Sequence, residues 1–252
     1  MKQAILTVTK LKKVYDDITV VDDISFEVQR GEIFGILGPN GAGKTTTLEM
    51  IETLRPIDGG SITIDGLDVA TQPSEVKRII GVQPQTPAFQ DKQKAVEIIE
   101  MFAAAYGEKV NAKKFLDDVQ LGEKANSYAE SLSGGQKQRL SIAAALVHNP
   151  KVFFLDEPTT GLDPQARRNL WDLIRLVRDR GVTVIMTTHY LDEAELLCDR
   201  VAIMDNGKII ALDTPQKLVK QLLGRGFHKE QRVEQANLDD VFIDLTGKAL
   251  RD

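Results

Sequence analysis

The sequence predicts an α/β fold that begins with antiparallel β structure and carries a helical insertion in its middle. Three observations support this fold class. An apolar run at residues 33–37 leads directly into a glycine-rich loop and then into a helical pattern. The character changes from about position 95 to position 147, where three helical stretches follow one another. After Pro150, strand-like and helical segments alternate, which is the pattern of a parallel sheet covered by helices.

The N-terminal part is predicted to be β structure around a strand–loop–helix unit. Leu48 and Ile51 fall on one face of a helical pattern, so we expect a helix over residues 45–54. An Asp65-Gly66 pair is typical of a tight turn and ends the last strand of this part. The expected strands are residues 4–9, 24–28, 33–37 and 61–65.

The middle third is predicted to be a helical insertion made of three helices. The first contains the apolar residues of the stretch 96–105, and the second, residues 111–119, carries Lys and Asp on its outer side. The third repeats apolar residues at i, i+3, i+4 and i+7 and ends at Pro150. These apolar residues are Leu140, Ala143, Ala144 and Val147.

Strands and helices alternate in the last third of the chain. Residues 152–155 are wholly apolar, as expected for a parallel strand that is buried on both faces. Pro164 is a favourable first residue for the helix that follows. Residues 182–187 are another predicted strand, and the Asn-Gly pair at 206–207 predicts a hairpin. From Gly224 onward the chain is polar, and we expect a loosely attached tail.

The composition is that of an ordinary globular protein. Of the 252 residues, 42% are hydrophobic and 27% are charged. The net charge is -5 and Lys and Arg form no basic stripe, so a nucleic acid is not expected as a partner. Cys198 is the only cysteine, which excludes a disulfide within the chain and fits a reducing compartment.

The sequence contains no predicted membrane-spanning or secretory segment. Its N-terminus lacks the apolar core of a signal peptide. Nowhere do about 18 apolar residues run together, which is the length that a membrane helix needs. We therefore expect a cytosolic chain whose membrane role, if it has one, comes through a partner.

A phosphate-binding loop is predicted between the strand at 33–37 and the helix at 45–54. The segment satisfies the pattern G-x-x-x-x-G-K-[ST] in the strand–loop–helix context that this pattern requires. Its glycines let backbone N–H groups turn toward phosphates at a helix N-terminus. Lys44 can reach the β- and γ-phosphates, and the Thr45 hydroxyl is suited to Mg²⁺. The candidate nucleotide-binding residues are Gly38, Pro39, Asn40, Gly41, Ala42, Gly43, Lys44, Thr45 and Thr46.

An acidic pair follows the apolar strand at 152–155. The carboxylate of Asp156 is expected to face the bound metal, either directly or through water. Glu157 is placed to accept a proton from an attacking water molecule. Acidic residues are also common caps at strand ends, so the phosphate loop is what favours the chemical role of the pair.

Polar residues near two other strand ends are further candidates. His189 follows the strand at 182–187, and ligands gather at the carboxyl ends of strands in α/β sheets. His189 could therefore contact the γ-phosphate and the attacking water, whereas His148 and His228 are expected at the surface. Gln85 could bind the metal or position water, and Gln83 is a rival candidate for the same role.

The segment Leu132-Ser133-Gly134-Gly135-Gln136 completes a set of motifs that resembles the ATP-binding subunit of ABC transporters. We call residues 132–136 the signature segment. The resemblance extends from about residue 4 to about residue 220. It implies a P-loop NTPase core with an N-terminal antiparallel β subdomain and an inserted α-helical subdomain at about residues 86–150. The ATP-binding domain would be residues 1–223, followed by a C-terminal tail at 224–252.

The resemblance implies a shared site in which each of two head-to-tail subunits supplies half. The signature segment is also a plausible serine N-cap of the next helix, and in the family both roles hold at once. Ser133, Gly134, Gly135 and Gln136 would meet the γ-phosphate held by the opposite subunit. Asp163 resembles the aspartate that crosses the dimer interface.

The resemblance also assigns individual roles to matching positions. Tyr15 matches the aromatic that stacks on adenine, although packing on the core is an alternative. Gln85 matches the glutamine that links the metal site to the helical subdomain, which favours it over Gln83. Glu157 matches the glutamate that polarises water, and His189 matches the switch histidine. The implied catalytic residues are Glu157, His189 and Lys44, and the implied Mg²⁺ ligands are Thr45, Gln85 and Asp156.

The tail supplies a narrower resemblance. Residues 238–247 resemble the closing motif of the branch that exports drugs, antibiotics and polysaccharides, with Asp239 in place of the more usual Glu. An amphipathic helix that packs on the core is an alternative for this segment. Its apolar residues are Leu238, Val241, Phe242 and Leu245.

Together these features predict an ATP-hydrolysing motor subunit of an ABC exporter. We expect ATP and Mg²⁺ as ligands, an integral-membrane permease as partner, and a homodimer or a heterodimer with a related ATP-binding subunit. The expected location is the cytoplasmic face of the membrane. The alternative is a soluble ABC ATPase that is not linked to transport, but the single set of motifs and the short segment between Thr45 and Leu132 match neither the ribosome-acting nor the DNA-repair types.

Overall fold

The computed structural model describes residues 3–85, 89 and 92–227 of the chain. The chain divides into two compact units, Met1–Leu218 and Val219–Asp252. The described strands all belong to the first unit. Helix α8 (Pro215–Gly224) runs across the division, and the tail motif at 238–247 lies outside the described residues.

A six-stranded sheet forms the centre of the first unit, with the order β10-β9-β3-β8-β7-β6. The five strands from β9 to β6 are parallel, and β10 pairs antiparallel with β9 through the predicted Asn-Gly hairpin. The strands are β3 (Ile33–Leu37), β6 (Ile80–Gln83), β7 (Val152–Asp156), β8 (Thr183–Thr188), β9 (Arg200–Asp205) and β10 (Lys208–Asp213). The predicted parallel sheet is therefore confirmed, and its carboxyl ends lie side by side.

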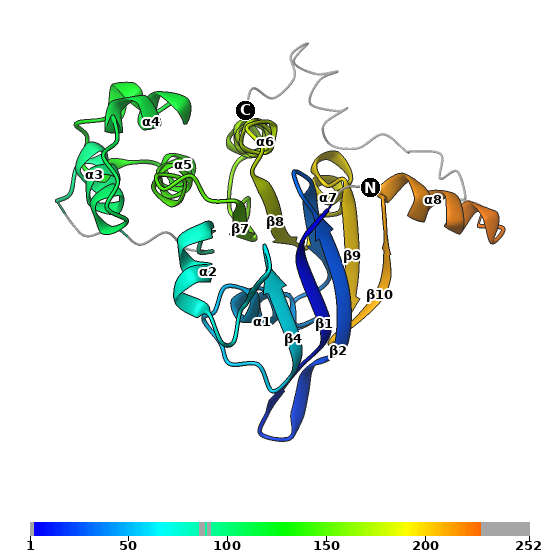
Figure 1. Ribbon diagram of the computed structural model, residues 1–252. Helices are drawn as coiled ribbons and strands as arrows, with labels where there is room; N and C mark the ends of the chain where they lie inside the picture. Colours follow the sequence, from blue (N-terminus) through cyan, green and yellow to red (C-terminus); the bar gives the residue numbers. More distant parts are fainter. Residues whose placement is uncertain (1–2, 86–88, 90–91, 228–252) are drawn as a thin grey trace, which may run out of the picture. The chain divides into compact units, whose positions relative to one another are not determined.

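An antiparallel sheet with the order β2-β1-β4-β5 forms the N-terminal part (Figure 1). Its strands are β1 (Ala4–Tyr15), β2 (Ile18–Gln29), β4 (Gly59–Ile64) and β5 (Leu67–Asp68). Both β1 and β2 are longer than the sequence predicts. Their pairing shifts register at several points, and Lys10 and Asp23 have positive φ, so the apolar alternation breaks within each strand.

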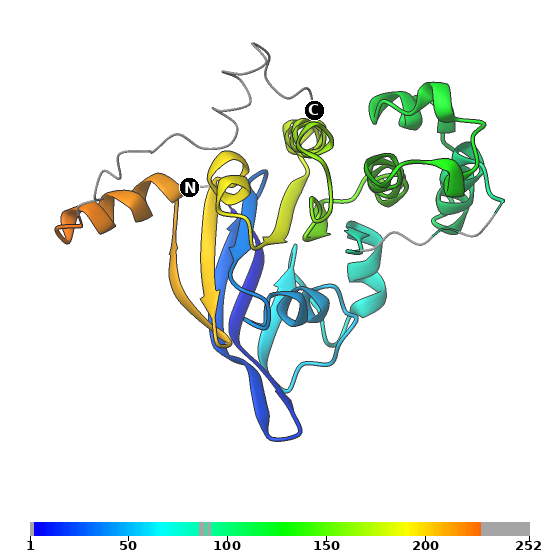
Figure 2. The ribbon, with the colours of Figure 1, turned by 180° about the vertical axis from the view of Figure 1, so that it is seen from behind.

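Three helices of the middle third lie together, away from the antiparallel sheet in both views (Figures 1 and 2). They are α3 (Ala95–Ala105), α4 (Ala112–Asp118) and α5 (Gly134–Ala145). Two 3-10 turns, Gly122–Lys124 and Ala129–Ser131, connect α4 to α5. The predicted helical insertion is confirmed, although α5 ends at Ala145 rather than at Pro150.

Four further helices pack around the central sheet. They are α1 (Lys44–Ile51), α2 (Pro73–Ile79), α6 (Pro164–Asp179) and α7 (Leu191–Leu197). The sequence predicts α1 and α6 but neither α2 nor α7. No helix in the described part of the chain is both long enough and apolar enough to cross a bilayer.

Each face of the parallel sheet contributes to a different part of the core. Phe34, Phe154 and Ile185 pack with α1 and the antiparallel sheet. Phe153 and Met186 face the opposite way and pack with α5, α6 and α7. Because both faces are covered by apolar side chains, the sheet is rigid and its carboxyl ends form a fixed platform.

Candidate active site

The loop between β3 and α1 is shaped by close approaches that only glycine allows. A Cβ atom at Gly38 would lie 2.1 Å from the backbone oxygen of Met204. At Gly43 it would lie 2.6 Å from the backbone oxygen of Val20, and the φ of Gly43 is +97°. These glycines therefore hold the loop against β2 and β9 in a conformation that a larger residue would disrupt.

The N-terminus of α1 presents free backbone donors. The N–H groups of Gly41, Gly43, Lys44 and Thr45 have no backbone acceptor among the described residues. Gly43 precedes the helix and supplies no side-chain cap. Uncapped N–H groups at a helix N-terminus attract an anion, so the loop fits a phosphate group.

The Lys44 side chain folds back over the loop. Its ammonium group donates to the backbone oxygens of Gly38 and Pro39, at 2.9 and 3.1 Å. It also lies 3.2 Å from Oε1 of Glu157, and the Lys44 side chain is only 4% exposed. The ammonium group of Lys44, which the sequence predicts to bind phosphate, thus lies next to the acidic pair Asp156-Glu157 at the end of β7.

Asp156 stands at the carboxyl end of β7, facing the start of α1. Its Oδ1 accepts hydrogen bonds from the hydroxyls of Thr187 and Thr45, the latter at 3.3 Å. Burial raises the pKa of Asp156, and these two hydrogen bonds oppose the rise. A hydroxyl and a carboxylate at this spacing suit Mg²⁺, which takes one or two protein ligands together with phosphate oxygens.

Glu157 is held in an unusual backbone conformation at the centre of the site. Its φ is +45°, and its N–H donates to the Thr187 hydroxyl at 3.0 Å. Burial alone would raise the pKa of Glu157, but contacts with Lys44 and His189 outweigh it and bring the pKa below its ordinary value. Non-glycine residues with positive φ are strained and gather at functional sites.

His189 completes this group from the end of β8. Its Nδ1 lies 3.0 Å from Oε2 of Glu157, although the ring is not aligned for a hydrogen bond. The ring also lies against that of Tyr190, with the centroids 4.1 Å apart. The structure therefore brings together Lys44, Glu157 and His189, which we call the catalytic cluster.

The structure adds Thr187, which the sequence analysis did not select. Its hydroxyl donates to Asp156 and accepts from the N–H of Glu157, and its side chain is fully buried. It pairs with Asp156 across β7 and β8. Its place in the run Thr187-Thr188-His189, at the carboxyl end of β8, is the signal that could have identified it.

In the described part of the chain, no hydrogen bond or ion pair joins Gln85 or Tyr15 to the catalytic cluster. Gln85 is exposed after β6, whereas Gln83 is fully buried in β6 and its amide has no hydrogen-bond partner in the described part of the chain. Tyr15 ends β1 and accepts a hydrogen bond from Arg55 at 3.1 Å. The roles of Gln85 in metal binding and of Tyr15 in adenine stacking stay predictions.

The signature segment forms the start of α5. The Ser133 hydroxyl accepts from the N–H of Gln136 at 3.3 Å, and the Gln136 side chain accepts from the N–H of Ser133 at 2.9 Å. This reciprocal pair is a capping box, so the N-cap interpretation is confirmed. Ser133 and Gly134 are exposed, and a Cβ at Gly134 would meet nothing within 4 Å.

Asp163 lies close to the signature segment on the same chain. Its carboxylate accepts from the N–H of Ala166 at 2.7 Å and caps α6. A Cβ at Gly135 would lie 3.1 Å from Cβ of Ala166 and 3.9 Å from a methyl group of Leu162. The two motifs that the resemblance assigns to the opposite subunit therefore share one surface, which we call the signature surface.

A hollow of about 220 Å³ lies between the end of α1, β6 and the helical insertion. Its lining includes Glu52, Phe102, Tyr106 and His148. His148, expected at the surface, is half-buried, stacks on Tyr106 with 3.8 Å between centroids, and lies 2.9 Å from the backbone oxygen of Ile80. His228 lies outside the described residues.

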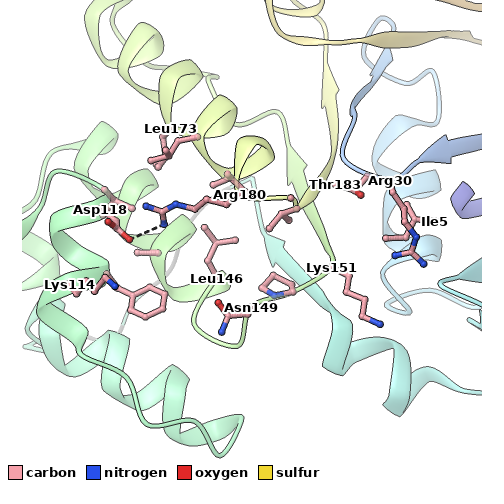
Figure 3. Close-up of a pocket in the computed structure, with 18 residues that line it drawn as sticks. Ile5, Arg30, Lys114, Asp118, Leu146, Asn149, Lys151, Leu173, Arg180 and Thr183 are labelled. Atoms are coloured by element: carbon pink, nitrogen blue, oxygen red, sulfur yellow. Dashed lines mark hydrogen bonds and ion pairs between the residues drawn. The ribbon is translucent and has the colours of Figure 1, made fainter. Parts of the chain in front are cut away.

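A second hollow, of about 510 Å³, lies among α4, α5, α6 and the starts of β7 and β8 (Figure 3). An ion pair of 2.9 Å between Arg180 and Asp118 joins α6 to α4 at this hollow. None of the predicted site residues lines it. Ligands of α/β sheets bind at the carboxyl ends of the strands, so this hollow does not compete with the catalytic cluster as the active site.

Comparison with known proteins agrees with the geometry. Residues 21–160 match the family model described as ABC transporter. The chain is 42% identical over 224 residues to the linearmycin resistance ATP-binding protein LnrL of Bacillus subtilis, covering 87% of this chain and 72% of that protein. It is 42% identical over 229 residues to the Nod factor export ATP-binding protein I of Burkholderia thailandensis, covering 89% and 75%.

Solved structures show the same fold. One, an ATP-binding subunit of an ABC transporter, has a TM-score of 0.78 and 31% identity, and the match covers 96% of this chain and 99% of that one. Another, cbiO1 from Clostridium perfringens, part of the transporter complex cbiONQ, has a TM-score of 0.77 and 29% identity, covering 89% and 94%.

Proposed function

The chain belongs to the ABC transporter family as an ATP-binding subunit, and from this premise we propose that it is the motor of an exporter. The main support for the proposal is that the catalytic cluster lies beside a loop whose free N–H groups can bind phosphate. Relatives named for drug resistance and for Nod factor export favour outward transport. We further propose that residues 1–223 are the ATP-binding domain, with its helical subdomain at about 86–150, and that residues 224–252 are a C-terminal tail.

ATP binding is assigned to the loop and α1. The free N–H groups and Lys44 would hold the β- and γ-phosphates, and Thr45 and Asp156 would hold Mg²⁺, with Gln85 as a further ligand. The metal supplies charge stabilisation to the phosphate oxygens when it is bound. Tyr15 would stack on adenine, because the β1–β2 hairpin that carries it passes over Gly43 at Val20.

Hydrolysis is assigned to Glu157 and His189. The water oxygen forms a bond to the γ-phosphorus while the bond from that phosphorus to the β–γ bridging oxygen breaks. ADP leaves, and the water proton passes to the Glu157 carboxylate. The lowered pKa of Glu157 keeps its carboxylate ionised in the nucleotide-free chain. His189 would contact the γ-phosphate and hold the water in line.

A head-to-tail dimer would complete each site. Ser133, Gly134, Gly135 and Gln136 would reach the γ-phosphate held by the opposite subunit, and Asp163 would cross the dimer interface. Ser133, Gly134 and Asp163 are exposed on a common surface, apart from the catalytic cluster, and this exposure supports the arrangement. The opposite subunit would be a second copy or a related ATP-binding chain.

The permease is proposed to dock over the hollow beside β6. Leu54 and Tyr106 are exposed at this hollow, and they would give an inserted helix of the permease an apolar seat. Gln85 lies two residues after the end of β6, so docking there would connect the permease with the proposed metal site. This partner would hold the chain at the cytoplasmic face of the membrane.

The direct test is ATP hydrolysis by the purified chain, alone and with the membrane protein that co-purifies with it. We expect Mg²⁺-dependent hydrolysis that Lys44→Ala abolishes, because the phosphates lose their ammonium partner. Lys137→Ala, which changes a lysine of α5 outside the cluster, is the matched control and should hydrolyse ATP normally. No hydrolysis by the wild type under either condition would contradict the proposed function.

A further inference from the structure

Side-chain contacts connect α6, which follows Asp163, with α7, which follows His189. α6 begins directly after Asp163, and α7 begins two residues after His189. Arg167 of α6 stacks over the Tyr190 ring at 4.6 Å and lies 3.7 Å from the carboxylate of Asp192. Further along, Arg175 of α6 donates to the backbone oxygen of Leu196 of α7 at 3.2 Å, so side chains of α6 reach α7 at more than one level.

Glu193 is the buried centre of this junction. Its side chain is fully buried, and its Oε1 accepts a hydrogen bond from the indole N–H of Trp171 at 3.0 Å. Its Oε2 and the fully buried hydroxyl of Thr159 have no hydrogen-bond partner among the described residues. Burial raises the pKa of Glu193, against the opposing effect of Thr188, Trp171 and Thr159.

A buried carboxyl is an energetically unfavourable group for packing two helices together. An apolar side chain of similar volume would fill the same space without the free-energy cost of removing a carboxyl from water. What a carboxyl adds is a directional contact between the two helices, the hydrogen bond that Glu193 on α7 accepts from Trp171 on α6. Thr188 at the end of β8 and Thr159, two residues after Glu157, also act on the pKa of this carboxyl.

Trp171, Thr188 and Thr159 belong to segments that adjoin residues of the proposed mechanism. Thr188 precedes His189, Thr159 follows Glu157 by two positions, and α6 starts after Asp163. The distance that matters for hydrolysis is the 3.0 Å between Nδ1 of His189 and Oε2 of Glu157. Neither side chain is fixed to the other by an aligned hydrogen bond, so this distance depends on the segments that carry them.

We propose that Glu193 is a positioning residue for ATP hydrolysis, which holds α7 against α6 and so sets His189 in place beside Glu157. This proposal rests on the proposed function. Glu193 does not touch the nucleotide, and it acts through the backbone of the residues that do. Loss of its contacts should therefore change the rate of hydrolysis and leave ATP binding unchanged.

The test compares Glu193→Ala with Glu193→Gln in steady-state ATP hydrolysis by the full chain. Glu193→Ala should lower kcat about 10- to 100-fold, the size of effect that a small misplacement of reacting groups produces, with KM for ATP nearly unchanged. Glu193→Gln keeps an acceptor for Trp171 without a charge and should restore most of the lost rate. Glu195→Ala, on the exposed side of α7, is the matched control.

A double-mutant cycle separates positioning from general damage. If Glu193 acts through His189, then Glu193→Ala should cost little further rate in a His189→Ala background. Independent, multiplicative losses would overturn the proposal, as would wild-type kcat in Glu193→Ala. Should Glu193→Ala fail to fold, Trp171→Phe removes the indole donor alone and is expected to lower kcat in the same way. Absence of hydrolysis in the wild type would instead count against the proposed function itself.

Discussion

The catalytic cluster and the signature surface are built in opposite ways. Lys44, Glu157 and His189 are held against one another, and the side chains of Lys44 and Glu157 are only 4% and 10% exposed. Ser133 and Gln136 instead satisfy each other's backbone groups at an exposed helix start. The first region is assembled by contacts within one chain, whereas the second is an exposed helix start, as the proposed head-to-tail dimer requires. In that dimer each chain would carry two unlike half-sites.

The largest expected effect comes from breaking the catalytic cluster at Glu157. Glu157→Gln removes the proton acceptor but keeps the size and shape of the side chain. ATP hydrolysis should slow by roughly 10²–10⁴-fold, the usual contribution of a positioned base, and ATP-bound dimers should accumulate. Turnover measured by phosphate release, together with size-exclusion chromatography in ATP, checks both effects. Near-normal hydrolysis would remove Glu157 from the mechanism and leave the cluster without a base.

The second prediction tests whether the two regions work in different subunits. Lys44→Ala breaks the cluster, and Ser133→Arg places a bulky side chain on the signature surface. Each variant alone should be inactive, but a mixture should recover hydrolysis, because a mixed dimer retains at most one site with both halves intact. The mixture is measured against equal amounts of each variant alone. Full-rate hydrolysis by either variant as a monomer would contradict the two-subunit arrangement.

A third prediction concerns a carboxyl at the far end of the helix that carries Lys44. Burial, with the nearby Asp156 and Glu49, raises the pKa of Glu52 from 4.5 to about 8. The folded state therefore binds this proton more tightly than the unfolded state does, and it loses stability as the pH rises from about 4.5 to 8. The loss is about 1.4 kcal/mol for each unit of pKa difference, so it should be readily measurable.

Thermal unfolding of the nucleotide-free chain between pH 6 and pH 9 checks this dependence. Glu52→Gln should flatten the fall in Tm with rising pH and raise Tm most at the alkaline end. Glu75→Gln, which changes an exposed carboxyl of α2, is the control and should follow the wild type. Identical pH profiles for Glu52→Gln and the wild type would show that Glu52 is ionised in the folded chain throughout this range.

The sequence predicts the catalytic cluster better than the surroundings of the cluster. The phosphate loop and Asp156-Glu157 each lie within one short segment, so their spacing along the chain is enough to recognise them. The contact between Lys44 and Glu157 joins residues that are far apart in sequence, and only the parallel pairing of β7 and β8 with β3 brings them together. Glu193 and Thr187 act through such long-range contacts, which leave no local pattern.

The missed elements are short or irregular. Only Val76 of α2 is buried, so this helix shows no apolar periodicity in the sequence. The long strands β1 and β2 are interrupted by residues with positive φ, which divide each apolar pattern into pieces. In each case the fold is fixed by pairing with a neighbour, and a single segment read alone carries too little information to predict it.

The smallest expected effect separates the two roles of the signature segment. Ser133→Ala removes the N-cap of α5 and should lower the free energy of unfolding by about 0.5–2 kcal/mol, measured by urea denaturation of the nucleotide-free chain. Ser133→Asn keeps a side-chain acceptor at this position and should restore stability. If the serine acts only as a cap, the asparagine variant will also hydrolyse ATP at the normal rate. If its hydroxyl also meets the γ-phosphate of the opposite subunit, hydrolysis will stay low although the helix is capped, and this outcome is the one that the signature surface predicts.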